Sequence, residues 1–165
     1  MHDSAYKDAE RFAKKYLDPE KPLLIADIGS MNINGCLKPL FDNPPRWMYR
    51  GFDLEAGNNV DVVVPSLYDW TNVPSVFFHV VLATQTLEHV AQPWTWFAEV
   101  VRITEPGGLI YLCSPNTWPF HEHPIDAWRV WPDGLRGLFE WAGVECVEAY
   151  KNGPDTTGIA MKPQV

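Results

Sequence analysis

Short, almost wholly apolar segments alternate along this chain with segments of helical periodicity, and this alternation constrains the fold more than any other feature. A strand that is buried on both faces reads as a continuous apolar run, whereas a strand with one wet face alternates apolar and polar residues. Residues 23–28 and 77–83 are runs of the first kind, and residues 94–103 have the spacing of a helix. The order predicts an α/β domain in which helices cover both faces of a parallel sheet.

The same patterns assign the remaining elements. The expected strands are residues 23–28, 47–54, 60–64, 77–83, 109–113, 144–150 and 158–161. The expected helices are residues 5–17, 35–41, 94–103 and 132–142. Pro39 fits the second helix only in its first turn, because proline has no N–H to donate. Residues 65–74 are too few for a normal crossover helix, so a loop with one turn is expected there.

Length and charge limit the classes of protein to consider. A chain of 165 residues fits one domain, residues 1–165, with a sizeable core. Its net charge of −8 leaves no excess of Lys and Arg for a phosphate backbone, which argues against nucleic acid as the main partner. No apolar run is long enough to cross a bilayer, so no membrane association is expected. Three widely spaced cysteines favour reduced thiols and a cytoplasmic protein. The oligomeric state has no signal in the sequence.

The end of the first expected strand carries an acid and a glycine, Asp27 and Gly29, and Gly35 follows. A glycine at such a strand end lets a ligand approach the backbone, and free N–H groups there attract its polar end. Five residues separate Gly29 from Gly35 and Cys36 follows, which does not match a P-loop, and the dinucleotide glycine pattern is absent as well. A nucleotide-like ligand is indicated, although not by either of those motifs.

Two further strand ends complete a possible crevice. Asp53 ends the second strand, 26 residues after Asp27, where an acid can accept both hydroxyls of a ribose. Thr84 and Gln85 end the fourth strand and would form the far wall. Ligands of parallel sheets bind at the carboxyl ends of the strands, which is where all of these residues are expected.

These motifs, together with the glycines of residues 106–108 and the Leu-Glu-His turn of residues 87–89, resemble the class I S-adenosylmethionine-dependent methyltransferases. The compact, methyltransferase type 11-like kind is the most similar, and the resemblance runs from Leu24 to about Lys162. It implies a Rossmann-like three-layer α/β/α sandwich, with a mostly parallel seven-stranded sheet and an antiparallel last strand. It also implies S-adenosyl-L-methionine as the cofactor.

The resemblance assigns cofactor-binding residues as well. Asp53 would hold the ribose, Leu54 would lie beside the adenine, and Thr84 and Gln85 would line the far wall. The loop that would hold the methionine part contributes Asp27, Gly29, Ser30, Asn32 and Gly35.

Three positions depart from the family pattern. Met31 replaces the usual second glycine, His79 replaces an aspartate that often opens the fourth strand, and residues 65–66 replace an acid that often follows the third. The last change leaves recognition of the adenine amino group open. The alternative for the two anchors is that Asp27 only caps a turn and Asp53 only ends a strand.

A polar stretch, residues 114–129, follows the fifth strand, and similar methyltransferases often carry its Phe-His-x-His-Pro-x-Asp-x-aromatic-Arg pattern here. The functional interpretation is that four catalytic residues line the acceptor pocket, with one histidine as base: His121, His123, Asp126 and Arg129. The alternative is that the histidines and Asp126 satisfy backbone groups of the loop and that Arg129 pairs with Asp126.

No metal site is expected from this stretch, because His121, His123 and Asp126 lack the ligand spacing of known sites. Glu88 and His89 face the crevice by resemblance, or cap a helix, or contact the Asp126 loop.

The function expected from these features is transfer of a methyl group from S-adenosyl-L-methionine to a small molecule or glycan. Such an in-line displacement mainly requires alignment of the reactants and exclusion of water. One alternative is a non-catalytic S-adenosylmethionine-binding subunit that supports a partner. A nucleotide-dependent oxidoreductase is a weaker alternative, since the dinucleotide pattern fails.

Overall fold

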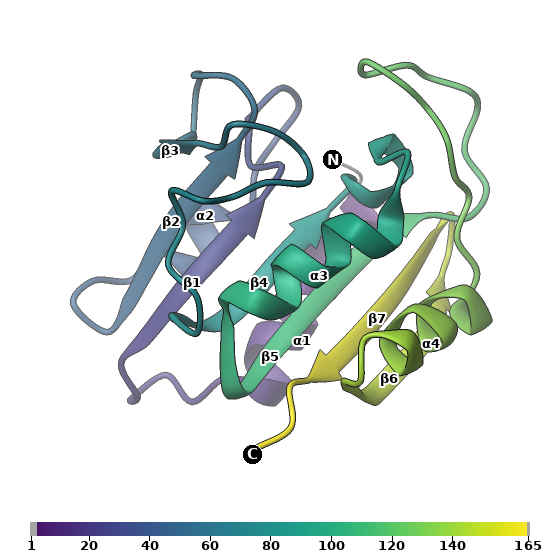
Figure 1. Ribbon diagram of the computed structural model, residues 1–165. Coiled ribbons are helices and arrows are strands. Elements are labelled where there is room, and N and C mark those ends of the chain that lie inside the picture. The colour runs from purple at the N-terminus through teal and green to yellow at the C-terminus, as the bar shows by residue number, and fades with distance from the viewer. Residues whose placement is uncertain (1–2, 165) are drawn as a thin grey trace.

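The computed structural model describes residues 3–164, which form a seven-stranded sheet covered by helices on both faces (Figure 1). The strands lie in the order β3-β2-β1-β4-β5-β7-β6. Their bounds are β1 Leu23–Ile28, β2 Trp47–Asp53, β3 Val62–Val63, β4 Phe78–Thr84, β5 Thr104–Pro115, β6 Glu145–Asn152 and β7 Asp155–Met161. The helices are α1 Asp3–Tyr16, α2 Lys38–Phe41, the 3-10 helix η1 Leu87–His89, α3 Pro93–Ile103 and α4 Pro132–Trp141.

The sheet has the direction pattern that the sequence predicted. Strands β3, β2, β1, β4 and β5 pair in parallel, whereas β7 runs antiparallel to both β5 and β6. Since β1 lies between β2 and β4, the ends of these three strands meet at one edge of the sheet. The expected fold, a Rossmann-like α/β/α sandwich with an antiparallel last strand, is confirmed.

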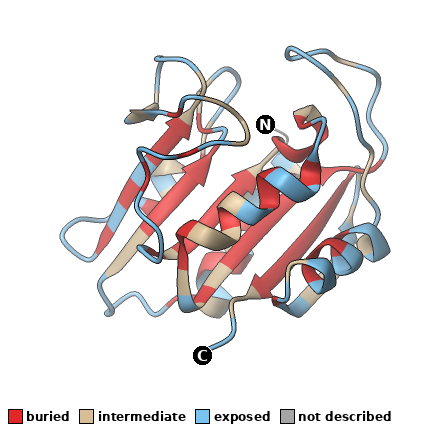
Figure 2. Cartoon of the chain, in the orientation of Figure 1, coloured by how far each residue is buried: buried red, intermediate tan, exposed pale blue. Residues whose placement is uncertain are grey.

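Two apolar cores, one on each face of the sheet, hold the three layers together. Helices α3 and α4 pack on one face through buried side chains such as Phe97 and Phe139. Helices α1 and α2 pack on the other face, where Phe12 and Phe41 contact each other. Buried residues accordingly fill the strands, while the exposed residues gather on the outer helix faces and in loops (Figure 2).

Two connections differ from a regular alternation of strands and helices. The expected strand 60–64 shortens to two residues, and no helix lies between β2 and β4. The loop before β4 instead buries Trp70, whose backbone N–H donates to Glu99 of α3, and Arg102 clamps that glutamate. The loop expected for residues 65–74 is therefore present, and an indole replaces a helix as the cover of this end of the core.

Helix α2 is only four residues long, and Pro39 lies in its first turn as predicted. Among residues 3–164, no helix is long and apolar enough to cross a membrane. Cys36, Cys113 and Cys146 are all free thiols.

Candidate active site

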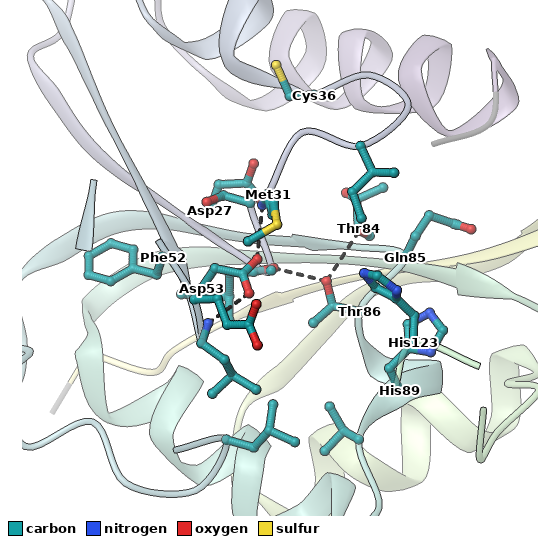
Figure 3. A pocket seen from close by; sticks show the side chains of 18 of the residues that line it. Asp27, Met31, Cys36, Phe52, Asp53, Thr84, Gln85, Thr86, His89 and His123 are labelled. Atoms are coloured by element: carbon teal, nitrogen blue, oxygen red, sulfur yellow. Dashed lines mark hydrogen bonds between the residues drawn. The ribbon is translucent and has the colours of Figure 1, made fainter. Parts of the chain in front are cut away.

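A cavity of about 730 Å³ opens at the carboxyl ends of β1, β2 and β4. Most of the residues singled out in the sequence line it: Asp27, Gly29, Ser30, Gly35, Asp53, Leu54, Thr84, Gln85, His121 and His123. Asn32, Asp126 and Arg129 were also predicted site residues, but they are not among the lining residues. In Figure 3 the acids of β1 and β2 lie on one side of the cavity and the histidines on the other.

The carboxylate of Asp27 is buried at the end of β1. The Tyr49 hydroxyl donates to Asp27 Oδ2 over 2.6 Å, and the Asn59 amide donates in turn to the Tyr49 oxygen over 2.8 Å. Burial raises the pKa of Asp27 to about 7, the Tyr49 hydrogen bond opposes the shift, and the nearby Asp53 charge adds to it. A cationic group of a ligand beside Asp27 would stabilise the charged carboxylate.

Asp53 closes the loop after β1 and is still able to bind a ligand. Its Oδ2 accepts the Met31 backbone N–H over 3.0 Å, and its Oδ1 accepts the Leu54 N–H over 2.7 Å (Figure 3). Each carboxylate oxygen has two lone pairs, so both can accept a further hydrogen bond. The proposed ribose contact and the structural role are therefore compatible.

Gly29 is required by a close contact within the protein as well as by any ligand. Its φ of +76° is a conformation that side chains rarely adopt, and a Cβ there would lie 2.3 Å from the Thr86 hydroxyl oxygen. That hydroxyl is itself fixed, because it donates to the Ile28 carbonyl over 3.0 Å. A substitution of Gly29 would thus disturb the junction of β1 and β4 before it could reach a ligand.

Asn32 forms a turn and is not among the residues that line the cavity, so its contact with a cofactor remains a prediction. Its side-chain oxygen accepts the Gly35 N–H over 2.9 Å, and its backbone N–H donates to Asn58. Asn and Asp favour such local bonds to a backbone N–H two or three residues ahead. Gly35, at φ +109°, completes the turn.

The far wall of the cavity carries the unbonded hydroxyl of Thr84 and the hydrogen-bonded side-chain amide of Gln85. The Thr84 hydroxyl is buried and has no hydrogen-bond partner among residues 3–164, so it is available to a bound molecule. Gln85 has a positive φ of 56°, and its side-chain amide donates to Asp155 Oδ1 over 3.0 Å. Its amide nitrogen is therefore already engaged, whereas Thr84 offers a free group that the sequence could not distinguish.

Asp126 and Arg129 form an ion pair that fastens the loop after β5, instead of lining the cavity as predicted. Both guanidinium Nη atoms donate to Asp126, over 2.5 and 2.7 Å, and only 1% of the Asp126 side chain is exposed. Hydrogen bonds from Arg129 hold the pKa of Asp126 well below its usual range. Arg129 also donates to the carbonyls of Trp118 and Pro119, and Asp126 accepts the His121 backbone N–H. The alternative left open by the sequence, a pair that holds the loop, is the one observed.

The cavity wall nearest this loop is formed by three histidines. His89 belongs to η1, and its ring lies 5.0 Å from that of His121 and 6.2 Å from that of His123, centroid to centroid. Burial lowers the pKa of His89. His89 Nδ1 donates to the backbone carbonyl oxygen of loop residue Ile125, so η1 contacts the Asp126 loop as one sequence interpretation anticipated.

Glu88 lies behind these histidines and is fully buried. Its Oε2 accepts the Ser114 hydroxyl over 2.9 Å, and burial raises its pKa to about 7. Sequence patterns left the role of Glu88 open and did not single out Tyr49 at all. The available signal for Tyr49 was its place on β2, the strand that pairs with the strand of Asp27. That place does not distinguish a hydrogen-bond partner of Asp27 from an ordinary core residue.

Comparisons with known proteins agree with this geometry. Residues 49–112 match the family model of a methyltransferase domain. A search of curated proteins found no match.

Solved structures share the fold at low sequence identity. One belongs to a complex between the Haloferax volcanii Trm112 methyltransferase activator and a methyltransferase, with TM-score 0.71 and 17% identity over 99% of this chain and 91% of that chain. A SAM-dependent methyltransferase from Aquifex aeolicus has TM-score 0.72 and 15% identity over 96% and 90%. A Burkholderia thailandensis 1,6-didemethyltoxoflavin-N1-methyltransferase with bound S-adenosylhomocysteine has TM-score 0.72 and 14% identity over 97% and 79%.

The matched residues run from within β2 to within β5 and so include the ends of β2 and β4 at the cavity but not β1, and the solved structures share the fold over nearly the whole chain. Together the family match and the shared fold support a class I methyltransferase, which confirms the resemblance that the motifs indicated.

Proposed function

We propose that the chain is an S-adenosylmethionine-dependent methyltransferase that acts on a small molecule or glycan. The observation that carries the proposal is the division of one cavity between two kinds of side chain. The acids Asp27 and Asp53 stand at the ends of β1 and β2, and His123 stands on the opposite side of the cavity, which His121 also lines (Figure 3). One side suits the cofactor and the other suits an acceptor.

The cofactor side offers groups that complement each polar part of S-adenosylmethionine. Asp27 is a buried carboxylate that a ligand ammonium would stabilise, and Asp53 has acceptor capacity for ribose hydroxyls. The unpartnered Thr84 hydroxyl lies on the same cavity, so a bound molecule would satisfy a group that the protein leaves open. When bound, the cofactor supplies an electrophilic methyl group.

The protein's own contribution to the transfer is alignment. The loop after β5 is held by the Asp126–Arg129 pair, and this fixes His121 and His123 at the cavity wall. An imidazole there would take the proton of an acceptor hydroxyl as the new bond to carbon forms. Asp126 and Arg129 position that loop and do not touch the acceptor.

A second candidate, a partner-supporting or partner-dependent S-adenosylmethionine-binding subunit, is favoured by one observation. The loop after β5 exposes large apolar side chains, with Phe120 73% exposed and Trp131 50% exposed. Exposed apolar groups of this size are typical of contact surfaces. The Haloferax neighbour was solved with a methyltransferase activator, so a protein partner is compatible with this fold.

Thermal denaturation with added ligand tests the cofactor assignment. S-adenosylmethionine and S-adenosylhomocysteine at about 100 times their dissociation constants should stabilise the folded chain by about 2.7 kcal/mol. For a chain of this size, that corresponds to a rise in melting temperature of roughly 5–10 °C. NAD should give none. Stabilisation by NAD alone would contradict the proposal.

Transfer of isotopically labelled methyl groups to a panel of sugars and small polar metabolites then separates an enzyme from a binding subunit. Label in an acceptor product, lost in His121→Ala and His123→Ala at unchanged S-adenosylhomocysteine affinity, is the expected result. Cofactor binding without label transfer to any acceptor would favour the subunit.

A further inference from the structure

Three side chains with metal-binding groups converge on the acceptor wall of the cavity. Glu88 and His89 come from η1, and His121 comes from the loop after β5. One ligand atom of each residue lies within 4.8 Å of the other two. His89 and His121 line the cavity, whereas Glu88 lies behind them.

Glu88 has an oxygen that receives no hydrogen bond from the described part of the chain. The residue is fully buried, and its Oε2 accepts the Ser114 hydroxyl, but its Oε1 has no partner. That oxygen lies 3.7 Å from His89 Nε2, which is too far for a hydrogen bond. A buried carboxylate oxygen without a partner is costly, and a cation bound between Glu88 and the neighbouring His89 and His121 would satisfy it.

The hydrogen bonds of the His89 and His121 imidazoles engage Nδ1 and leave Nε2 free to bind an ion. His89 Nδ1 lies 2.5 Å from the Ile125 carbonyl oxygen, and His121 Nδ1 lies 3.0 Å from the Pro119 carbonyl oxygen. A carbonyl only accepts, so each Nδ1 carries the hydrogen, and each Nε2 of the neutral ring has a free lone pair. Metal-bound histidines typically donate their second nitrogen to a backbone carbonyl or carboxylate in this manner.

We propose that Glu88, His89 and His121 bind a divalent transition-metal ion, with Zn²⁺ the best match. Two imidazoles and one carboxylate form the ligand set of many open zinc sites, in which a remaining position is left for water or substrate. Because the two histidines line the cavity, that position would face the acceptor side. The sequence analysis expected no metal site because it weighed only His121, His123 and Asp126, whereas this set takes two of its three ligands from η1.

The surrounding bonds hold this ligand set in place. The Asp126–Arg129 pair anchors the backbone of His121, and the Ser114 hydroxyl orients the Glu88 carboxylate. The three ligand atoms lie within 4.8 Å of one another and would need to move closer together to reach a common ion. Resting on the proposed function, the acceptor class would then be a hydroxyl compound, whose oxygen an ion at this wall would polarise, and of the two loop histidines His123 would be the one left to act as base.

Calorimetric titration of Zn²⁺ into untagged, chelator-treated protein tests the site directly. We expect one ion per chain. Removing a ligand, in Glu88→Gln or His121→Ala, should weaken binding by at least about 100-fold, and Ser114→Ala should weaken it by about 10-fold through loss of orientation. His79→Gln is the matched control, because His79 lies on β4 outside the cavity and should leave the affinity unchanged.

Melting temperatures of the metal-free variants show which of them fold, and added Zn²⁺ should raise the melting temperature of wild type but not of Glu88→Gln. Absence of binding, equal affinity in folded Glu88→Gln and His121→Ala, or an equal loss in His79→Gln would overturn the site. S-adenosylhomocysteine is titrated separately into the metal-free protein. Failure of that titration would refute the proposed cofactor function and leave the metal result standing.

Discussion

The two sides of the cavity are built in different ways. On the cofactor side, neighbouring parallel strands place Asp27 and Asp53 next to each other, and hydrogen bonds to Tyr49 and to the backbone of Met31 and Leu54 fix them. On the acceptor side, the side chains lie on a long loop. The cofactor side is therefore a property of the sheet, whereas the acceptor side depends on a few side-chain contacts.

Two buried carboxylates sharpen this contrast. Asp27 and Glu88 both have a pKa raised to about 7 by burial. Asp27 accepts a short bond from Tyr49 and is one of the lining residues, but Glu88 keeps one oxygen without a partner. Substitutions on the cofactor side should consequently affect the fold and the cofactor, and substitutions on the acceptor side should affect the loop.

The largest effect is expected from Gly29→Val, which tests how firmly the cofactor side belongs to the fold. The variant forces a side chain into a positive φ and against the Thr86 side chain, so it should lower the free energy of unfolding by about 3 kcal/mol or more. Chemical denaturation measures this change. Gly137→Val is the matched control, because a Cβ at Gly137 of α4 meets nothing within 4 Å. Equal stability of the two variants would show that the β1–β4 junction tolerates a side chain.

The pH dependence of stability tests the burial of Asp27. Its pKa is 3.8 in the absence of burial and about 7 in the folded protein, so the folded state binds the proton more tightly than the unfolded chain. The stability from this proton is fully present below about pH 4 and is lost as the pH rises through about 7.

In Asp27→Asn that loss should disappear, so the variant should gain roughly 2–4 kcal/mol over wild type between about pH 4 and pH 8. Urea denaturation across this range measures the difference. Asp133→Asn, at an exposed side chain of α4, should follow the wild-type profile. A parallel pH profile for Asp27→Asn and wild type would contradict the raised pKa.

The smallest effect on the fold is expected from Asp126→Asn, which breaks the ion pair of the acceptor loop. The amides of residues 117–131 should exchange with solvent roughly 10-fold faster or more, because the loop loses its clamp. The amides of β1 and β2 should keep their protection, and S-adenosylhomocysteine affinity should stay within about threefold. Faster exchange throughout β1 and β2 would show that the two sides of the cavity are not independent.

The sequence predicted the sheet and the cofactor side better than the acceptor side, for a physical reason. Apolar runs identify buried strands, and the ends of adjacent parallel strands must meet, which brought Asp27 and Asp53 together without knowledge of any loop. The loop before β4 was expected from its length, but the two-residue length of β3 and the burial of Trp70 depended on tertiary packing, which no local pattern shows.

Side-chain partners within loops could not be predicted, because they depend on the path of the chain. The Asn32 side chain accepts a hydrogen bond from the Gly35 backbone, and Asp126 pairs with Arg129. Glu88 and His121 lie close together although they are 33 positions apart in the sequence, and their spacing does not predict this proximity. Residue types alone therefore identified the region of the site but not the role of each side chain in it.

The most direct test of the central claim, that this cavity binds S-adenosylmethionine with its ribose on Asp53, is calorimetric titration with S-adenosylhomocysteine. Wild type should bind one molecule per chain, and Asp53→Ala should bind at least about 10-fold more weakly, since a charged hydrogen-bond acceptor is worth about 1.5–3 kcal/mol. Asp61→Ala is the control, because Asp61 also accepts a backbone N–H, from Gly51, but does not line the cavity. The same affinity in wild type and a folded Asp53→Ala, or no binding to wild type, would contradict the claim.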